Sequence, residues 1–316
     1  MRVLALFLAW VLAGALQAAQ IRDARPLMGT AAEIVAEGAD EVRLREGAEA
    51  AFREMRRLSD MMSHYEPSSV VSAINAAAGV RAVAVPAELA EVLAQARRVS
   101  ERTGGAFDVT VGALRGWRFR PGEERVPAPQ ELAAQLAKVD FRKLETGAGK
   151  AFLTEPGMRI DLGGIAKLYI LDAGRRVLRS HGVGRALVNG GGDVVAHSDG
   201  APWRVGVRDP REPARLLGTL ELAEGAVASS GDYERFFERE GRRYHHILDP
   251  RTGHPPRGVR GVTLVGSVEA VNGLGPALMV LGPEAARRLV ASAKIEGVIV
   301  DAAGRLWMSP GLRLAR

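Results

Sequence analysis

Helix and strand patterns occur in separate groups along this chain of 316 residues, and this grouping constrains the fold more than any other feature. Apolar residues recur at helical spacing in several long segments before residue 181, whereas short strand-like runs dominate between residues 185 and 266. Strict alternation of strands and helices would favour a parallel α/β sheet. Grouped elements instead predict an α+β fold, with mainly antiparallel sheets packed against helices.

Capping and turn residues set the expected boundaries of the elements. Asp40 can cap a helix whose apolar face begins with Val42 and Leu44. Pro86 and Gly104 mark the two ends of another helix. The expected helices are 40–63, 86–102, 129–139, 165–180, 269–281 and 283–293. The expected strands are 30–36, 157–162, 185–188, 203–208, 217–222, 226–229, 243–248 and 261–266, with a last hairpin formed by 297–301 and 304–308.

The composition is that of a globular protein, and it excludes several functions. Hydrophobic residues make up 47% of the chain and charged residues 25%, which is enough for a sizeable core. The formal net charge is +6, but acidic residues interleave with the basic ones, so no binding of nucleic acid is expected. The absence of cysteine excludes disulfides, cysteine-ligated zinc and thiol catalysis.

The N-terminus has the pattern of a targeting segment. Arg2 precedes an apolar run over residues 3–16, and small residues follow at which a signal peptidase could cut. This run is shorter than the ~20 apolar residues that a membrane-spanning helix needs. We therefore expect residues 1–19 to be a signal peptide and residues 20–316 to form one periplasmic domain. An uncleaved anchor is the alternative, and without cysteine the chain is not a lipoprotein.

Two glycine-rich turns carry the first chemical signals. In Asp161-Leu-Gly-Gly-Ile-Ala-Lys167 an apolar strand ends at an acid, and a helix begins after two glycines. Glycine lets the backbone approach a ligand closely, and free N–H groups at a helix start attract phosphate. Asn189-Gly-Gly-Gly-Asp193 follows another strand, and its amides could form a second anion site. Spacing alone leaves an ordinary tight turn and a flexible hairpin open as alternatives.

Histidine and aromatic residues add further candidates. His246 and Asp249 stand three residues apart before a turn, so His246 could act as a general base, and Asp249 could orient it or cap the turn. A structural role for the adjacent pair His245 and His246 is the alternative. Tyr65 and Phe107 lie in loops and could stack on a planar ring, with plain core packing as the alternative. No phosphate-binding loop, dinucleotide fingerprint, hydrolase elbow or zinc motif supports another enzyme class.

Taken in order, six segments resemble the FAD:protein FMN transferase family, known as the ApbE family. They are Met28-Gly-Thr30, Tyr65 in its Ser-rich loop, Gly105-Ala-Phe-Asp108, Asp161-Leu-Gly-Gly-Ile-Ala-Lys167, Asn189-Gly-Gly-Gly-Asp193, and Ser230-Gly-Asp-Tyr233 with His246-Ile-Leu-Asp-Pro-Arg-Thr-Gly253. Each is weak alone, but six in this order are specific. The resemblance implies an α+β core of packed antiparallel sheets and helices, with a T-fold-like architecture.

The resemblance also implies an activity and a set of site residues. The protein would move FMN from FAD to a Thr or Ser hydroxyl of an acceptor flavoprotein, such as a membrane-associated redox complex, and release AMP. His246 would be the catalytic base, with Asp249 beside it. The residues expected to bind FAD are Met28, Tyr65, Ala106, Phe107, Asp108, Asp161, Lys167 and His246. A magnesium ion would be held in part by the backbone carbonyl of Gly164.

The sequence departs from the family at the other magnesium ligands. The family's Asp and Thr fall on Asn272 and Pro276 here. Asn272 keeps an oxygen but has no charge, and Pro276 has no side-chain oxygen and would disturb a helix. We therefore expect weak magnesium binding. Leu168, where the family usually has glycine, is a second departure.

These departures leave three functions open. In the first, transfer survives with a weak or rearranged metal site. In the second, the protein binds FAD as an accessory protein and no longer transfers FMN, because the usual ligands are Asn272 and Pro276. In the third, water replaces the acceptor and the protein hydrolyses FAD. The His246-to-Asp249 segment favours transfer, since a protein that only binds FAD has little need of a base.

Overall fold

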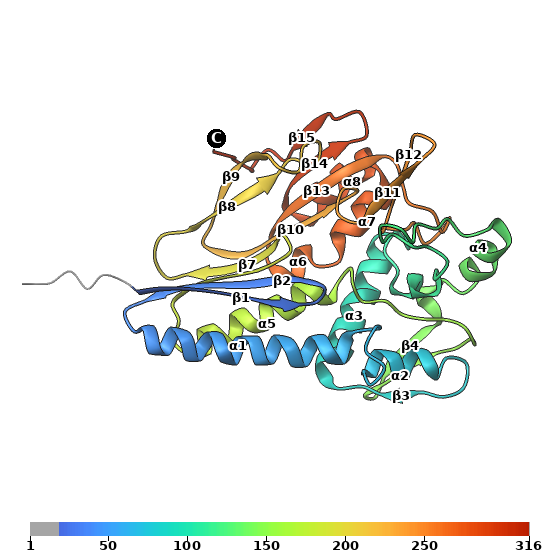
Figure 1. Ribbon diagram of the computed structural model, residues 1–316, viewed down its shortest axis with the longest axis horizontal. Helices are drawn as coiled ribbons and strands as arrows, with labels where there is room; N and C mark the ends of the chain where they lie inside the picture. Colours follow the sequence, from blue (N-terminus) through green and yellow to red (C-terminus); the bar gives the residue numbers. More distant parts are fainter. Residues whose placement is uncertain (1–18, 316) are drawn as a thin grey trace, which may run out of the picture.

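A computed structural model describes residues 19–315, and its main element is an eight-stranded antiparallel sheet (Figure 1). The strand order across the sheet is the order along the chain. In this order the strands are β1 (Ala19–Leu27), β2 (Thr30–Gly38), β6 (Arg185–Gly190), β7 (Asp193–Ser198), β10 (Glu224–Gly231), β13 (Val259–Gly266), β14 (Glu296–Asp301) and β15 (Leu306–Met308). The predicted α+β class with mainly antiparallel sheets is confirmed.

The other elements cover this sheet or extend from one end of it. The helices are α1 (Glu41–Met62), α2 (Val70–Ala76), α3 (Ala87–Arg102), α4 (Pro129–Leu136), α5 (Ala166–Ser180), α6 (Val268–Val271), α7 (Leu274–Leu281) and α8 (Pro283–Ala293), with short 3-10 helices at Val109–Ala113 and Phe141–Lys143. Small sheets are formed by β3 (Val83–Ala84), β5 (Lys150–Leu153) and β4 (Leu144–Gly147), by β8 (Trp203–Arg208) and β9 (Leu216–Leu222), and by β11 (Phe236–Arg239) and β12 (Arg242–His245).

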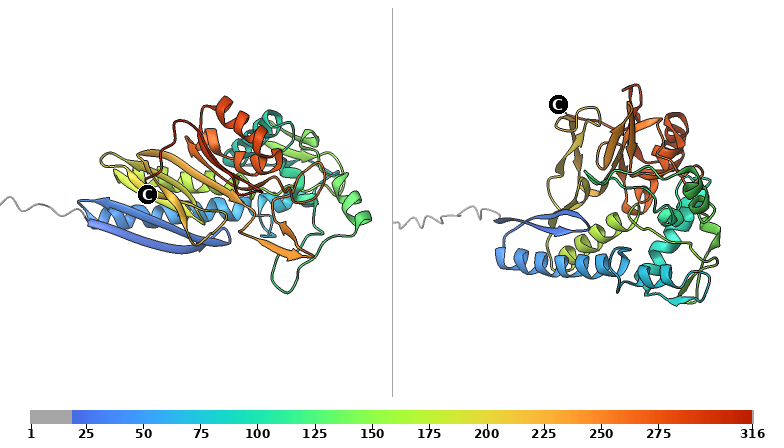
Figure 2. Two further views of the ribbon diagram at one scale, coloured as in Figure 1. Left: turned by 90° about the horizontal axis from the view of Figure 1, so that it is seen from above. Right: turned by 45° about the vertical axis from the view of Figure 1, so that its right-hand side comes forward.

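Both faces of the large sheet carry apolar side chains. Successive side chains of a strand point to opposite faces, and in the central strands consecutive residues are hydrophobic. Ile34, Val188 and Val195 pack in the main core, which they share with α1 and α5. Their neighbours Val35 and Leu187 pack against a smaller core with β8 and β9. Figures 1 and 2 show the two helices and this hairpin on opposite sides of the sheet. The site described below therefore stands on a sheet supported from both sides.

The helix pair α1 and α5 forms much as the sequence predicts. Asp40 caps α1 by accepting a hydrogen bond from the Arg43 amide at 3.1 Å. A side chain on Gly174 would stand only 2.7 Å from Met55 Sδ, so glycine allows the two helices to approach closely. Val42 was expected on the apolar face, but it is 66% exposed because it lies in the first turn, beyond the edge of the core.

The predicted strand over residues 157–162 is wrong. The segment is extended loop, and its polar backbone groups bond to a side chain and a loop rather than to a neighbouring strand. Ile160 donates its amide to Asn75 Oδ1 at 2.7 Å and accepts from Asn75 Nδ2 at 3.0 Å. The Asp161 amide donates to the Val109 carbonyl at 2.8 Å. These bonds satisfy buried backbone groups without a sheet and hold Asp161 in place.

The predicted single helix over residues 269–281 is also wrong. The chain leaves the helix at Asn272, and Gly273 has a φ of +78°, which favours glycine and starts the new helix α7. Pro276 is consequently the third residue of α7. The N–H groups of a first turn have no partner within the helix, so proline does not disturb α7 there, contrary to our expectation.

Smaller differences concern strand boundaries. The strand expected to reach residue 248 ends at His245, which leaves His246 in the following loop. Six of the observed strands were not predicted from the sequence, namely β1, β3, β4, β5, β7 and β11. Residues 1–18 of the expected signal peptide lie outside the described residues, and β1 begins at Ala19. Between residues 19 and 315 the helices are too short or too polar to cross a membrane.

Candidate functional site

Two tight turns lie side by side at one end of the strands of the large sheet. Met28 and Gly29 join β1 to β2 with φ values of +52° and +71°. Gly191 and Gly192 join β6 to β7 with φ values of +64° and +96°. Because β2 pairs with β6, these turns are neighbours, and a side chain on Gly191 would stand 2.8 Å from Thr30 Oγ1. The structure thus brings the predicted residue Met28 beside the second glycine cluster.

An ion pair joins the two glycine-rich segments. Lys167 Nζ, in the first turn of α5, lies 2.7 Å from Asp193 Oδ2 at the start of β7. Asp193 Oδ1 accepts a hydrogen bond from the Ser229 amide at 2.9 Å, which fixes the carboxylate. Lys167 keeps 30% of its side chain exposed, so its ammonium can also reach a ligand. The first turn of α5 has no side-chain cap, as expected for a helix start that receives an anion.

The Asp161 carboxylate is held by the His64 side chain and by a backbone amide. Its Oδ1 lies 3.3 Å from His64 Nδ1 and accepts a hydrogen bond from the Gly163 amide at 2.7 Å. Desolvation opposes its ionisation, but the hydrogen bond and charge of His64, the Gly163 amide and the charge of Arg235 lower its pKa overall. The side chain remains 36% exposed. Asp161 is therefore a carboxylate that can accept hydrogen bonds from a ligand.

The Tyr65 side chain stands free at the surface beside this carboxylate. It is 76% exposed, and its ring centroid lies 3.9 Å from that of His64. An exposed aromatic ring next to a polar wall is unusual packing for a core residue and suits stacking on a planar ligand. The alternative of plain core packing is excluded for Tyr65.

His246 lies beside positive charges and lacks a hydrogen-bond partner. Its amide donates to the Arg235 carbonyl at 3.0 Å, but its buried Nδ1 has no partner among the described residues. Burial and the charge of Arg235, with smaller contributions from His245 and Lys167, lower the pKa of His246 to about 3. His246 is therefore neutral at neutral pH and able to accept a proton. We refer to Lys167, Arg235 and His246 as the cationic cluster.

The neighbours that the sequence suggested for His246 have structural roles. His245 is buried, and its Nε2 lies 2.9 Å from the Pro256 carbonyl. Among the described residues no hydrogen bond joins Asp249 to the His246 ring, so of its two expected roles Asp249 fills that of holding the turn. Its carboxylate instead accepts hydrogen bonds from the amide, Nε and Nη2 of Arg251, each at 2.9 Å, and its carbonyl accepts from Gly253 at 2.8 Å. Asp249 thereby fixes the turn that follows His246.

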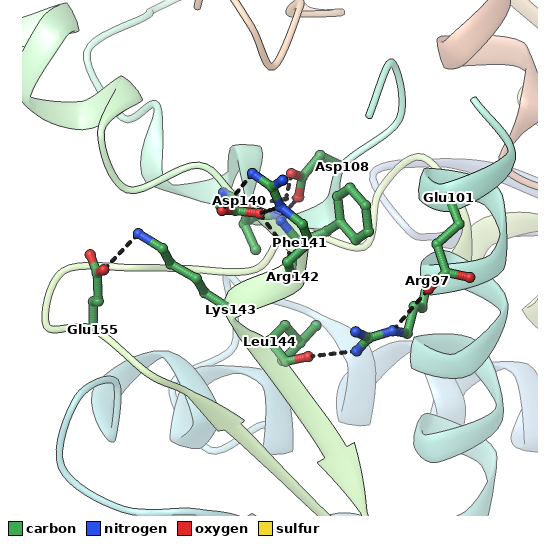
Figure 3. A network of polar contacts seen from close by, with 10 residues as sticks. Arg97, Glu101, Asp108, Asp140, Phe141, Arg142, Lys143, Leu144 and Glu155 are labelled. Carbon is green, nitrogen blue, oxygen red and sulfur yellow. Dashed lines mark hydrogen bonds and ion pairs between the residues drawn. The ribbon is translucent and has the colours of Figure 1, made fainter. Parts of the chain in front are cut away.

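The expected FAD-binding residue Asp108 also serves the structure. Its Oδ1 accepts hydrogen bonds from the amide and hydroxyl of Thr110, and its Oδ2 accepts from the Phe141 amide at 2.8 Å (Figure 3). Burial raises the pKa of Asp108, although these hydrogen bonds oppose the shift. Figure 3 shows the surrounding ion pairs, including Lys143 with Glu155. The hydrogen bonds of the Asp108 carboxylate are thus all within the protein, and its contact with FAD stays a prediction.

Ala106 and Phe107 are both buried and lie close to the predicted metal position. A side chain on Gly164 would stand 3.1 Å from Phe107 Cε2 and 3.3 Å from Pro276 Cγ. The backbone at Gly164 is therefore packed between these two rings. We refer to Gly164, Asn272 and Pro276 as the 164–272–276 cluster, and the structure brings Pro276 against Gly164.

The donor atoms of this cluster do not fit magnesium. Mg²⁺ prefers octahedral oxygen ligands and is usually held by one or two carboxylates together with substrate phosphates. The cluster offers one backbone carbonyl and one amide oxygen, and Pro276 offers none. Among the described residues there is no group of three His, Cys, Asp or Glu side chains suited to a metal. Leu168, the other departure from the family, is buried in the core and contributes packing only.

A groove of about 350 Å³ between α3 and α6 touches the site at one point. It shares Asn272 with the 164–272–276 cluster but contains none of the predicted FAD-binding residues. Its lining consists of Gln95, Arg98, Val99, Arg102, Ser267, Glu269, Ala270, Asn272 and Leu274. The predicted residues therefore converge elsewhere.

Comparison with known proteins places this geometry in a family. The model of the ApbE family matches residues 28–299. A FAD:protein FMN transferase of Klebsiella pneumoniae (strain 342) is 37% identical over 212 residues, which are 66% of this chain and 66% of that protein. The crystal structure of the ApbE protein from Thermotoga maritima is 34% identical, with a TM-score of 0.84, over 93% of this chain and 97% of that one. The flavin transferase ApbE from Vibrio cholerae is 29% identical, with a TM-score of 0.81, over 93% and 98%.

The chain therefore belongs to the ApbE family, as the six sequence segments predicted. The matched part spans 66% of the K. pneumoniae relative but nearly all of each solved structure.

Three site residues were missed in the sequence. His64 precedes Tyr65 in the same loop, and an ionisable residue beside an expected stacking ring was a usable signal. Arg235 follows the Ser230-to-Tyr233 segment closely, but an arginine in a turn has no signal of its own in an arginine-rich chain. Asn75 could be found only through its contact with Ile160, 85 residues away.

Proposed function

We propose that this protein is a FAD:protein FMN transferase, which moves FMN from FAD to a Thr or Ser hydroxyl of an acceptor flavoprotein. The observation that carries the proposal is the cationic cluster, in which a neutral His246 with an unpartnered Nδ1 stands among positive charges. Such a site suits a substrate with two phosphates and a reaction that needs a base. The names of the relatives support the same reaction.

The reaction begins when the acceptor hydroxyl oxygen attacks the phosphorus of the FMN half of FAD. The bond between this phosphorus and the bridging diphosphate oxygen breaks, and AMP leaves with that oxygen. His246 takes the proton of the hydroxyl. The product is FMN in phosphoester linkage to the acceptor. The chain's part is mainly positioning and electrostatics, with Lys167 and Arg235 near the phosphates and Tyr65 against the flavin.

The low pKa of His246 is matched to this substrate. Burial is the main cause of this low pKa, and the charges of Arg235 and, to a smaller extent, Lys167 lower it further while the site holds no anion. The two negative charges of a bound diphosphate offset these cations, so FAD raises the pKa of His246 towards its ordinary value. The imidazole is then a stronger base when the substrate is present than when it is absent. Uptake of protons on FAD binding at mildly acidic pH follows from the same linkage.

Magnesium supplies charge neutralisation at a diphosphate when a protein can hold it. The donor set of the 164–272–276 cluster does not suit this ion, so we assign no step to it. The acceptor is proposed to be an exported or membrane-associated redox protein. The signal-like residues 1–19 support a periplasmic location for the reaction, and fractionation of cells that produce the protein tests this.

Intact-mass measurement tests the transferase activity. The purified protein is incubated with FAD and with an acceptor domain that a relative modifies, and the acceptor is weighed. We expect a mass gain of one FMN, which disappears when the acceptor Thr or Ser is replaced by alanine. Free FMN without a mass gain would indicate hydrolysis. FAD binding with neither product would indicate the accessory role and reject the proposal.

A further inference from the structure

We infer that this protein handles the FAD diphosphate without a resident divalent cation, because the 164–272–276 cluster lacks the carboxylate and hydroxyl ligands that would hold one and Arg235 supplies the positive charge. The inference rests on the proposed function for its catalytic part. Its binding part concerns only the protein, FAD and metal, and is tested separately.

The amide of Asn272 is fixed by a hydrogen-bond chain. Gln95 Nε2 donates to the Glu269 carbonyl at 3.3 Å, and Asn272 Nδ2 donates to Gln95 Oε1 at 3.1 Å. A backbone carbonyl can only accept, so the Gln95 amide must present its nitrogen to Glu269 and its oxygen to Asn272. Asn272 must then donate. Position 272 is thus fitted to an amide group rather than to a carboxylate.

An aspartate at this position would meet an acceptor. Its ionised carboxylate would face Gln95 Oε1 in a buried place, since Asn272 is only 2% exposed. Gln95 would have to turn and give up its bond to the Glu269 carbonyl. The metal-binding acid of the family and the Gln95–Glu269 bond therefore exclude each other in this chain. Asn272 belongs to the packing between α3 and α6.

Pro276 stands at the position of the family's second side-chain ligand. Its ring carbon Cγ lies against Gly164, the residue whose carbonyl the family gives to the metal. Proline fits this place in the first turn of α7 without loss of a helix hydrogen bond. Proline has no side-chain oxygen, so position 276 supplies no hydroxyl ligand to a cation.

Arg235 is the cation available to the phosphates. Lys167 is already paired with Asp193, whereas Arg235 has no ion-pair partner among residues 19–315. Its charge lowers the pKa of both His246 and Asp161, so its guanidinium is within electrostatic range of both residues. The Arg235 carbonyl also accepts the His246 amide, which ties the two residues together. A guanidinium can bind phosphate oxygens in a bidentate manner.

Calorimetry of FAD binding, with EDTA and then with magnesium chloride, tests the binding part. We expect equal affinities in the two conditions, and no heat or thermal shift when magnesium alone is added. Arg235→Ala should weaken FAD binding by about tenfold or more, because a charge-assisted bond to phosphate is lost. Arg239→Ala, on the same hairpin, is the matched control and should leave it nearly unchanged. FAD binding that requires magnesium would overturn the inference.

Position 272 provides a second test that depends on neither activity nor Arg235. The double variant Asn272→Asp, Pro276→Thr restores the family's ligands, and the triple variant adds Gln95→Leu to remove the opposing acceptor. We expect magnesium to raise the melting temperature of the triple variant but not that of the unaltered protein. A magnesium-induced shift in the unaltered protein would contradict the inference.

The transfer assay completes the set. Transfer that proceeds equally in EDTA and in magnesium supports the inference, and transfer abolished by EDTA overturns it while the proposed function stands. If neither condition gives transfer, the proposed function fails, and the calorimetric results still decide whether this chain binds FAD without the cation.

Discussion

The two halves of the site differ in what their polar groups are bonded to. In the cationic cluster, His246 Nδ1 has no hydrogen-bond partner and Arg235 forms no ion pair among the described residues. In the 164–272–276 cluster, the Asn272 amide is bound to Gln95 and position 276 carries an apolar ring. The difference is one of unused capacity: the cationic cluster keeps a free ring nitrogen and a free positive charge, whereas the amide at position 272 is already bonded.

The largest effect should follow from removing the base. His246→Gln is expected to lower the rate of FMN transfer by about 10²–10⁴, the usual contribution of a general base, while FAD affinity changes little. Intact-mass kinetics and calorimetry give the two quantities. His245→Gln is the control, because His245 bonds to a backbone carbonyl and should affect stability more than rate. Equal rate losses in both variants would remove the distinction between the two histidines.

The second-largest effect should follow from removing Asn75, whose side chain holds the backbone next to Asp161. Asn75→Leu leaves the amide and carbonyl of Ile160 without partners, so we expect a loss of about 3 kcal/mol in the free energy of unfolding. Denaturant unfolding measures it, and FAD affinity should fall as Asp161 loses its position. Ser72→Ala on the same helix removes only a bond at the surface and should change stability by less than about 1 kcal/mol. A smaller loss for Asn75→Leu would show that another group holds Asp161.

The pH dependence of the unfolding free energy should also distinguish the cationic cluster from the 164–272–276 cluster. The folded-state pKa of His246 is about 3, below its unfolded value of about 6.5, so the unfolded chain binds more protons and stability falls as pH drops below about 6.5. At pH 5 this costs up to about 2 kcal/mol. His246→Gln should reduce the pH dependence of the unfolding free energy, whereas Asn272→Ala should not, because the 164–272–276 cluster has no titratable group. The reverse result would assign the titration elsewhere.

The smallest effect concerns Pro276. Because Pro276 lies in the first turn of α7, Pro276→Thr should change the free energy of unfolding by less than about 0.5 kcal/mol. Met279→Pro, in the middle of the same helix, is the contrast and should cost about 3 kcal/mol or more. Thermal unfolding of the two variants gives the comparison. A large loss with threonine would mean that the ring itself is needed for packing at Gly164.

Sequence reasoning succeeded where a local rule decides the structure. The cap Asp40 indicated the start of α1, and the glycine-rich motifs indicated two turns that the ion pair of Lys167 with Asp193 joins in the structure. It failed where distant groups decide. The segment ending at Asp161 is apolar like a strand, but Asn75 satisfies its backbone in place of a neighbouring strand. Gly273 broke a helix whose apolar pattern continues through it.

The roles within the site divide in the same way. The motifs identified Tyr65, Lys167 and His246, whose side chains remain free for a ligand or paired beside it. They also suggested Asp108 and Asp249, whose carboxylates hold loops together. A sequence motif contains both ligand-facing and structural residues, and only their hydrogen-bond partners in the structure distinguish the two kinds.

The order of strands in the large sheet bears on how the chain can be assembled. Every strand pairs with the sheet strand that comes before it along the chain, and all of these pairs are antiparallel. A polypeptide that leaves a ribosome or an export channel N-terminus first therefore finds the partner of each new strand already present. No strand of this sheet has to wait for a later one before it can pair, and at each stage a single growing edge is open. Stepwise emergence and stepwise folding can proceed in the same direction, up to the three-residue strand that completes the sheet.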